Sequence, residues 1–265
     1  MADQRPHTEE PAPAATVLLL RDEPAFEVLM IARHEKSAFA GGALVFPGGR
    51  IDPGDSAGEW RDFSAGLSTD SRVAAAQIGS IREAFEEAGI LLARDASGEI
   101  ISAAHTKTLN EWRSRIENND LLFLDLIRSE KLRLACDALH LFSHWVAPPG
   151  LHRRFDTLFF AARFPQGQVV LEDGNEATDA LWISPQRALD ARATGERKII
   201  FPTACNLGLL SQSKSVQETF DSAARRDIPP VTPIVIKRGG KPFLQIPQRL
   251  GYPVTEEAVD FARPD

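Results

Sequence analysis

A stripe of apolar residues runs through the strongly helical segment from about Arg72 to Ala93. An α-helix turns about 100° per residue, so side chains spaced three or four apart share one face. The stripe consists of Ile78, Ile81, Phe85, Ala88 and Leu92. Because such a face must be buried, the chain needs an opposing apolar layer, and its 43% of hydrophobic residues are enough for one large core.

Three glutamates lie on the other side of this helix. Glu83 and Glu87 are four residues apart, and Glu86 lies beside them. Like charges at this spacing cost helix stability, so the face is either fully solvated or normally occupied by a cation. Oxygen-rich clusters select hard cations such as Mg²⁺ or Mn²⁺ over softer metals. The residues alone leave the solvated face and the metal site as alternatives.

Short strands and helices are mixed irregularly along the rest of the chain. Apolar runs bounded by turn residues predict strands at 15–20, 26–32, 43–46, 139–146, 156–164, 169–171, 180–183, 233–236 and 243–246. Further helices are expected after Ser184-Pro185 and at 106–116, 121–131, 202–212 and 216–225. The absence of a strict strand–helix–strand alternation favours an α+β fold over a doubly wound sheet.

Charge and composition narrow the function classes. A formal net charge of −7 argues against a broad nucleic-acid surface. No apolar run approaches the roughly 20 residues of a membrane span, and the polar N-terminus lacks a secretory signal. Cys136 and Cys205 form no paired motif and are expected to be buried free thiols. We therefore expect a cytoplasmic protein without nucleic-acid or membrane partners.

The residues around the glutamates resemble a known motif. The segment Arg82-Glu83-Ala84-Phe85-Glu86-Glu87-Ala88-Gly89-Ile90 is similar to the second half of the Nudix box, with Ala84 in an aliphatic position. Gly49 resembles the glycine that opens the box. The family has a glutamate after five further residues, where this chain has Asp55. Seven residues usually separate that acid from the arginine, whereas 26 residues, from Ser56 to Ile81, do so here, an insertion of 19.

This interruption is itself a point of resemblance. Nudix proteins similar to the peroxisomal coenzyme A diphosphatase of animals break the box here, and they share stretches like Val45–Gly49 and Arg153–Thr157. The resemblance implies a Nudix-type α/β/α sandwich with a mixed central sheet and extra helices. It also implies a hydrolase domain over 14–213, with an insertion in the box at 55–72 and a helical insertion at 105–131, and a C-terminal extension, 214–265, packed on the domain. The polar residues 1–13 are expected to form a flexible leader.

The resemblance also implies a metal-dependent hydrolase. Glu83, Glu86 and Glu87 would hold Mg²⁺ or Mn²⁺, and the enzyme would cleave the diphosphate linkage of a nucleoside diphosphate derivative. Glu86 and Glu87 would take part in catalysis, and one glutamate or a carboxylate from a distant loop would act as general base. Arg82, also assigned to the catalytic group, would pair with a carboxylate of the helix and orient it.

Other residues would serve the substrate. Gly48 and Gly49 would let the backbone approach the substrate phosphates, and Arg33 and Arg154 would bind the substrate. Additional carboxylates for the site are expected from Asp55, Glu172, Asp173 and Glu176. A structural ion pair with Asp156 is the alternative for Arg153 or Arg154, and an exposed acidic turn is the alternative for the carboxylates at 172–176.

The choice of substrate stays open. Coenzyme A or acyl-coenzyme A is favoured because Arg33 and Gly42 fit a motif that precedes the box in related hydrolases, although Ala38 breaks that motif. ADP-ribose or NADH is the alternative substrate class. A non-catalytic nucleotide sensor is the alternative outside the enzymes, and the presence of all three glutamates argues against it. A homodimer is one assembly that the sequence leaves open.

Three aromatic or imidazole side chains have both a functional and a structural interpretation. His140 and His144 are four apart on a predicted strand and should share a face, which suggests zinc, but no third ligand is evident, so a structural role is favoured. Trp60 lies in the insertion and would touch the substrate if it were exposed there. Burial in the core is the alternative for this tryptophan.

Overall fold

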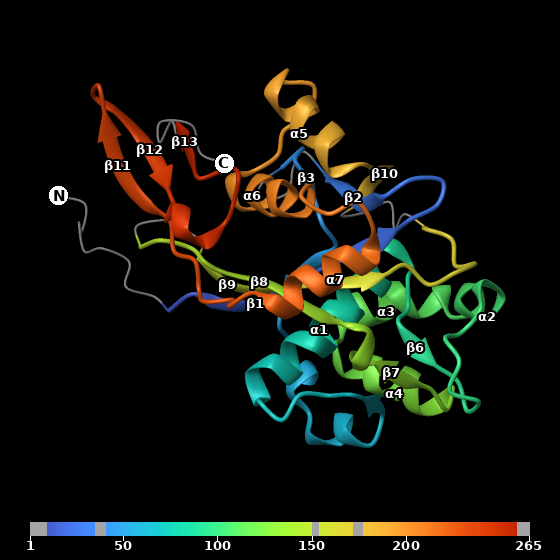
Figure 1. Cartoon of the computed structure of the whole chain (residues 1–265). Helices are drawn as coiled ribbons and strands as arrows, with labels where there is room; N and C mark the ends of the chain where they lie inside the picture. Colours follow the sequence, from blue (N-terminus) through green and yellow to red (C-terminus); the bar gives the residue numbers. More distant parts are fainter. Residues whose placement is uncertain (1–9, 35–40, 150–153, 172–176, 259–265) are drawn as a thin grey trace.

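A seven-stranded mixed sheet lies at the centre of the protein (Figure 1). The computed structural model describes residues 10–34, 41–149, 154–171 and 177–258. The strand order is β10-β2-β1-β9-β8, with β3 added to β2 and β4 to β1. Only β1 and β9 run parallel; the other pairs are antiparallel. The strands are β1 (Ala12–Arg21), β2 (Glu27–Arg33), β3 (Leu44–Val45), β4 (Gly48–Arg50), β8 (His140–Val146), β9 (Phe155–Arg163) and β10 (Ala177–Ile183).

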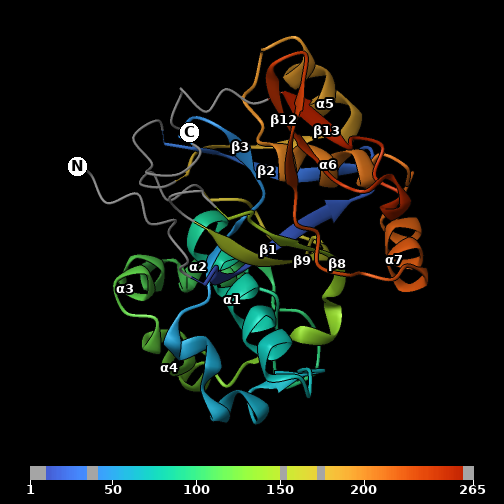
Figure 2. The same ribbon diagram turned by 90° about the vertical axis from the view of Figure 1, so that its left-hand side faces the viewer.

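Helices cover both faces of this sheet, which gives the expected three layers. Figure 2 shows α1 (Ser71–Ala88) on one side of β1, β9 and β8, and α6 (Phe201–Leu210) on the other. Side chains alternate along β1: Val17 and Leu19 join the core under α1, whereas Leu18 and Leu20 join the core under α5, α6 and α7. The remaining two helices of that second layer are α5 (Pro185–Ala193) and α7 (Val216–Arg225).

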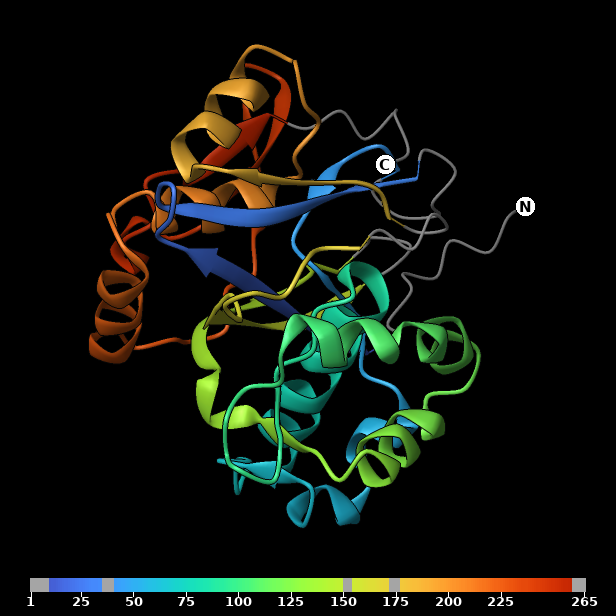
Figure 3. The ribbon, with the colours of Figure 1, turned by 90° about the vertical axis from the view of Figure 1, so that its right-hand side faces the viewer.

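A group of short helices lies beside α1. It comprises α2 (Ala103–Thr108), the 3-10 turn η3 (Asn110–Trp112), α3 (Arg113–Asn118) and α4 (Leu121–Ser129), drawn in green in Figure 3. The prediction of one continuous helix over 106–116 is wrong, because η3 redirects the chain and brings α3 against α1. A small sheet joins β6 (Ala93–Arg94), β5 (Ser64–Ala65) and β7 (Arg133–Ala135). The turns η1 (Pro53–Ser56), η2 (Gly58–Arg61) and η4 (Cys136–Ala138) complete this side.

Two predictions near the end of α1 are wrong, one for the end of the helix and one for a strand. The helix ends at Ala88 rather than near Ala93, because Gly89 takes a left-handed conformation with φ of 67°, which favours glycine. The segment 169–171 forms no strand. Instead, the backbone N–H of Leu171 donates to the carbonyl of Ala88 at 2.9 Å and caps the end of the helix.

The C-terminal part forms a third, separate sheet at the left of Figure 1. It consists of β11 (Ile234–Arg238), β12 (Lys241–Gln245) and β13 (Glu256–Ala258), and the turn η5 (Gln248–Leu250) lies between β12 and β13. Several contacts attach this part to the layer of α5 and α6, among them the following two. The ring centroid of Tyr252 lies 5.5 Å from that of Trp145 on β8, and the thiol of Cys205 donates to the carbonyl of Val254 at 3.2 Å.

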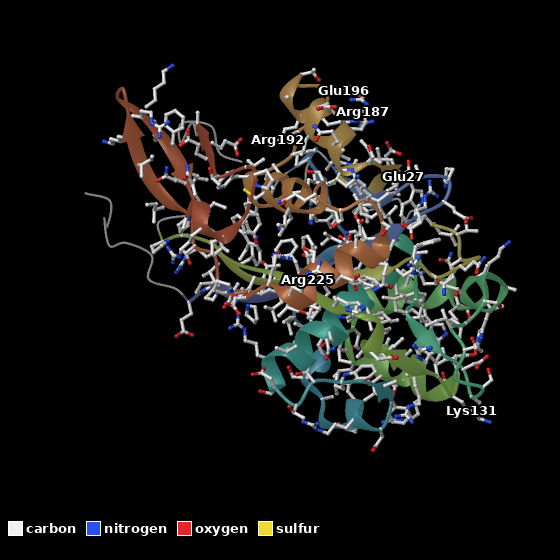
Figure 4. All side chains as sticks on the ribbon, in the orientation of Figure 1. Glu27, Lys131, Arg187, Arg192, Glu196 and Arg225 are labelled. Atoms are coloured by element: carbon white, nitrogen blue, oxygen red, sulfur yellow. The ribbon has the colours of Figure 1, made fainter. Side chains whose placement is uncertain are left out.

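Exposed ion pairs surround this framework. Arg187 and Glu196, labelled in Figure 4, pair at 2.8 Å at one end of α5, with both side chains about half exposed. Pairs of this kind contribute roughly 0–1 kcal/mol, so burial in the two cores supplies most of the stability. None of the described helices is both long and apolar enough to cross a bilayer.

Candidate functional site

The second half of α1 carries the glutamates and faces the turn that leads into β4. The helix begins where the side chain of Asp70 accepts the N–H of Val73 at 2.9 Å, an N-cap that satisfies one free donor. Ile78, Ile81 and Phe85 are fully buried under the sheet, as their spacing predicts. This burial sets the rotation of the helix about its axis and turns its polar side toward Gly48 and Gly49 of β4.

Arg82 is the centre of the site. It is 2% exposed, and its guanidinium binds Asp55 through two parallel hydrogen bonds, Nε to Oδ1 and Nη2 to Oδ2, both at 2.9 Å. Its Nη1 donates to Glu83 Oε1 and to Glu86 Oε1, each at 3.0 Å, and its Nη2 also donates to the carbonyl of Arg50 at 2.9 Å. These carboxylates raise the pKa of Arg82 further above its ordinary value. Such burial lets Arg82 orient the carboxylates that it binds, which is the pairing expected from the sequence, and its part in catalysis stays a prediction.

The two halves of the interrupted box are in contact in the structure, because Asp55 of the first half binds Arg82 of the second. Asp55 is 2% exposed in η1, where the N–H of Asp52 also donates to its Oδ2 at 2.9 Å. The residues inserted between Asp55 and Arg82 form η2, β5 and the loop before α1, and they leave the acid in contact with the arginine. Both oxygens of Asp55 bind Arg82, so this acid orients the arginine, and its use as an extra metal carboxylate stays a prediction.

The two glycines of β4 make room for neighbouring groups. A Cβ added to Gly49 would lie 2.5 Å from Oε1 of Glu83, and a Cβ added to Gly48 would lie 2.5 Å from the carbonyl of Ala15 on β1. The N–H of Gly48 donates to Oε2 of Glu87 at 2.9 Å. The sequence suggested that these glycines leave room for substrate phosphates. In the structure, Gly48 leaves room for the backbone of β1, and Gly49 leaves room for the carboxylate of Glu83.

Burial shifts the ionisation of the glutamates. It raises the pKa of Glu86 to about 7, with Arg82 opposing the shift. The pKa of Glu83 is raised well above its ordinary value, first by burial and then by the charges of Glu87 and Glu86, again with Arg82 opposing. Burial without a further cation therefore favours the protonated forms of Glu83 and Glu86.

The chemistry of these groups fits a divalent cation. Asp55, Glu83 and Glu86 share the single guanidinium of Arg82, and Glu87 accepts the N–H of Gly48, so the carboxyl groups outnumber the cation beside them. All the atoms that these side chains offer to a metal are oxygens, which suits Mg²⁺ or Mn²⁺. In the described part of the chain, no three acidic, histidine or cysteine side chains converge on one point. Two glutamates turn toward Arg82, and the third turns toward Gly48.

The helical segment 103–129 contacts both halves of the box, which the sequence gave no reason to expect. Asp120, just before α4, accepts the N–H of Gly54 in η1 at 2.5 Å. Trp60 is 2% exposed; its ring lies 5.5 Å from Phe123 of α4, and its Nε1 donates to the carbonyl of Gly54 at 2.9 Å. The hypothesis that Trp60 touches the substrate is therefore wrong, because the insertion folds into the core.

Arg113 is the second residue that the motif did not reveal. It lies on α3, is 5% exposed and donates from Nε and Nη2 to the carbonyl of Glu86 at 3.0 and 2.7 Å. An isolated arginine in a helical segment carries no sequence pattern that connects it to a glutamate 27 residues earlier. Only the packing of α3 against α1 identifies it.

The remaining candidates are scattered. Arg33 lies at the end of β2, where its N–H donates to the carbonyl of Ala43 at 3.0 Å. Arg154 donates from Nε and Nη2 to the carbonyl of Ala147, at 3.2 and 3.1 Å, and so supports the connection between β8 and β9. The expected carboxylates Glu172, Asp173 and Glu176 lie outside the described residues, as do Arg153 and Ala38.

His140 and His144 do not share a face, because β8 has a bulge between them. The ring of His140 stacks on Phe220 of α7 at 3.8 Å. His144 lies on the α1 side, where its Nε2 is 2.7 Å from Nη2 of Arg72. The same nitrogen of Arg72 lies 2.5 Å from Oδ1 of Asp156, and His144 Nε2 lies 2.7 Å from that oxygen, so both residues contact this acid. The bulge removes the geometry on which a shared zinc site would depend.

Comparison with known proteins connects this arrangement to one family. Residues 68–208 match a family model described as the NUDT19 Nudix domain. That range is more than half of the chain and contains Arg82–Ile90, and it begins after Gly49 and Asp55. In a crystal structure of a NUDIX hydrolase from Alicyclobacillus acidocaldarius, the similarity reaches a TM-score of 0.67 at 25% identity, covering 84% of this chain and 100% of that one. The expected Nudix-type α+β fold is confirmed.

Curated relatives point the same way. The chain is 29% identical over 206 residues to the acyl-coenzyme A diphosphatase NUDT19 of Xenopus laevis, covering 62% of this chain and 54% of that protein. It is 30% identical over 207 residues to the protein of the same name from Homo sapiens, covering 63% and 55%. The chain thus matches little more than half the length of these relatives.

Proposed function

The chain belongs to the NUDT19 Nudix family, and on this premise we propose that it is a Mg²⁺- or Mn²⁺-dependent diphosphatase. Its proposed substrate is a nucleoside diphosphate derivative, with coenzyme A or acyl-coenzyme A preferred. One observation carries the proposal: Glu83 and Glu86 bind the buried Arg82, and Glu87 of the same helical turn accepts the N–H of Gly48 at the start of β4. The names of the curated relatives support the choice of coenzyme A derivatives.

In this proposal Glu83, Glu86 and Glu87 hold the cation. A bound divalent cation neutralises the negative oxygens of a diphosphate and lowers the pKa of a bound water. Arg82 keeps two of these glutamates facing the site, and Asp55 keeps Arg82 in place. Gly48 fixes the third glutamate through its backbone N–H. The chain's own contribution is to hold several carboxylates together despite their mutual repulsion.

Proton transfer in this proposal falls to Glu86 or Glu87. Both residues lie on the turn of α1 that carries the proposed cation ligands, which puts a carboxylate near the water that the cation would activate. A carboxylate from 172–176 is the competing base, as the sequence suggested. Arg33 and Arg154 remain proposed substrate-binding residues, and for Arg154 a second role is added, because it also holds the carbonyl of Ala147. A homodimer also stays a prediction.

Turnover of a substrate panel tests the proposal. The protein is incubated with Mg²⁺ and, in separate reactions, coenzyme A, acyl-coenzyme A, ADP-ribose, NADH and dinucleoside polyphosphates, and the phosphate-bearing products are followed. We expect cleavage of the coenzyme A compounds, with a loss of at least about 100-fold in Glu86→Gln and in Glu87→Gln. Glu99→Gln, which changes an exposed turn glutamate, is the matched control and should keep full activity.

Two results would contradict the proposal at different levels. Much faster cleavage of ADP-ribose or NADH than of coenzyme A would replace the substrate and keep the chemistry. Tight nucleotide binding with no turnover of any compound would replace the enzyme by a nucleotide sensor.

A further inference from the structure

We propose that Arg113 is a positioning residue of the glutamate cluster: it holds the last turn of α1 in the shape that presents Glu86 and Glu87 to a divalent cation. This inference rests on the proposed function, because it assigns a role toward the same metal. It also gives the helical segment 103–129 a task in the site, since Arg113 reaches α1 from α3.

Two N–H groups of Arg113 are directed at a single atom. Two of its N–H groups, Nε and Nη2, donate to the carbonyl oxygen of Glu86 at 3.0 and 2.7 Å. A third, Nη1, donates to Oδ1 of Asn110 at 3.0 Å, which fixes the plane of the guanidinium. The residue is 5% exposed, so neither water nor a mobile side chain readily replaces these bonds.

The position of that carbonyl explains why a cation is useful there. The last four carbonyls of a helix have no partner within the helix, and the negative end of the helix dipole lies there. In α1, Gly89 N–H satisfies the carbonyl of Phe85, and Leu171 N–H satisfies that of Ala88, each at 2.9 Å. Arg113 satisfies the carbonyl of Glu86, which belongs to the same residue that carries one of the cluster carboxylates.

Repulsion among the glutamates destabilises the last turn of α1. Three glutamates on one face repel one another, and Arg82 pairs with Glu83 and Glu86 from the start of that turn. Arg113 adds positive charge at the other end, on the backbone side. Without it, the carbonyl of Glu86 would lose this partner, Arg82 alone would offset the repulsion among the glutamates, and a glycine follows the turn immediately. We expect that turn to loosen and the two carboxylates to lose their fixed spacing.

The anchoring of α3 and α4 makes Arg113 a rigid support. Asp120 fixes the start of α4 to η1 through the N–H of Gly54, and Phe123 packs on Trp60. The same helical segment therefore contacts the half of the box that holds Asp55 and the half that holds Glu86. Arg113 is the point at which this segment touches the metal-binding half.

The test measures Mn²⁺ affinity without any substrate. Arg113→Met removes the guanidinium and keeps the aliphatic stem, Arg113→Lys keeps the charge, and Arg115→Met is the matched control. Arg115 is an exposed arginine of the same helix whose guanidinium lies 4.1 Å over the ring of Trp112. Mn²⁺ binding is followed by electron paramagnetic resonance, and the melting temperature, kcat and KM are measured alongside.

We expect the Kd for Mn²⁺ to rise on the order of 10-fold in Arg113→Met, the scale of losing an outer support of a metal ligand. Arg113→Lys should restore part of this loss, kcat should fall more than KM rises, and Arg115→Met should match the unaltered protein. A Kd for Mn²⁺ in Arg113→Met within twofold of that in Arg115→Met, even with a lowered melting temperature, would overturn the proposal and leave a purely structural arginine.

If Arg113→Met fails to fold, Asn110→Ala takes its place. This variant keeps the arginine and removes the oxygen that orients it, so a rise of about threefold in the Kd for Mn²⁺ is expected, and an unchanged value overturns the proposal. Failure of the proposed diphosphatase activity gives a different result. It would leave every diphosphate uncleaved while the difference in Mn²⁺ affinity between Arg113→Met and Arg115→Met persists.

Discussion

Replacing Asp55 by asparagine should destabilise the fold strongly, although the side chain barely changes shape. Asp55 and Arg82 are each 2% exposed and share two hydrogen bonds of 2.9 Å. Removing one partner of a buried ion pair costs about 3–5 kcal/mol, because the other charge stays buried. An asparagine amide would also direct its own N–H groups at donors of Arg82 or at the N–H of Asp52, which now binds Oδ2.

The lower end of that range applies here. Arg82 keeps Glu83, Glu86 and the carbonyl of Arg50 as acceptors after the change, so its charge is not left alone. We therefore expect a loss of about 3 kcal/mol in the free energy of unfolding. For a chain of this size, that corresponds to a melting temperature lower by roughly 6–12 °C.

The assay is urea unfolding of the metal-free protein, followed by far-ultraviolet circular dichroism. Asp52→Asn is the matched control, because Asp52 also faces Arg82, but at 3.4 Å and with a side chain that is 42% exposed. Such a pair contributes less than about 1 kcal/mol. If Asp55→Asn lies within 1 kcal/mol of Asp52→Asn, the argument that Asp55 joins the two halves of the box is refuted.

Three other predictions concern the site and the thiols. Gly49→Ala puts a methyl group 2.5 Å from Oε1 of Glu83, so Mn²⁺ affinity should fall at least about 10-fold, whereas Gly58→Ala, with open space around it, should change nothing; equal affinities would contradict this. In metal-free protein, the pKa of Glu86 is raised to about 7, so the native state binds more protons than the unfolded chain between pH 4.5 and 7. Its contribution to stability is therefore greatest below that window and falls as pH rises through it, and urea midpoints that rise over the window in the metal-free protein but not in Glu86→Gln would disprove the assignment. Burial raises the pKa of Cys136 to about 12, so Ellman's reagent at pH 8 should leave this thiol unmodified until urea is added, and rapid modification of the native protein would contradict its burial.

The amino-acid sequence by itself determined the elements that have a strong local pattern. The apolar spacing from Ile78 to Phe85 determined both the existence of α1 and the side on which its glutamates lie. Residues at this spacing share one helix face, and once that face is buried the glutamates must lie on the other side. The bounds of α7 (Val216–Arg225) were predicted from the chain to the residue. Ser184 before Pro185 marked the start of α5, where its side chain accepts the N–H of Arg187.

Tertiary structure decided the features that depend on partners far apart along the chain. Periodicity could not show that Asp55 returns to Arg82 across a long insertion, because that contact follows from the burial of both groups. Nor could it show the bulge that separates His140 from His144, because one extra residue in a strand leaves no trace in its composition. Arg113 depends on how α3 packs against α1, which is a property of two surfaces. A local pattern involves residues of one helical turn or one strand, so the sequence shows it directly. Contacts across the core join residues far apart in the chain, and they form only when the layers pack together.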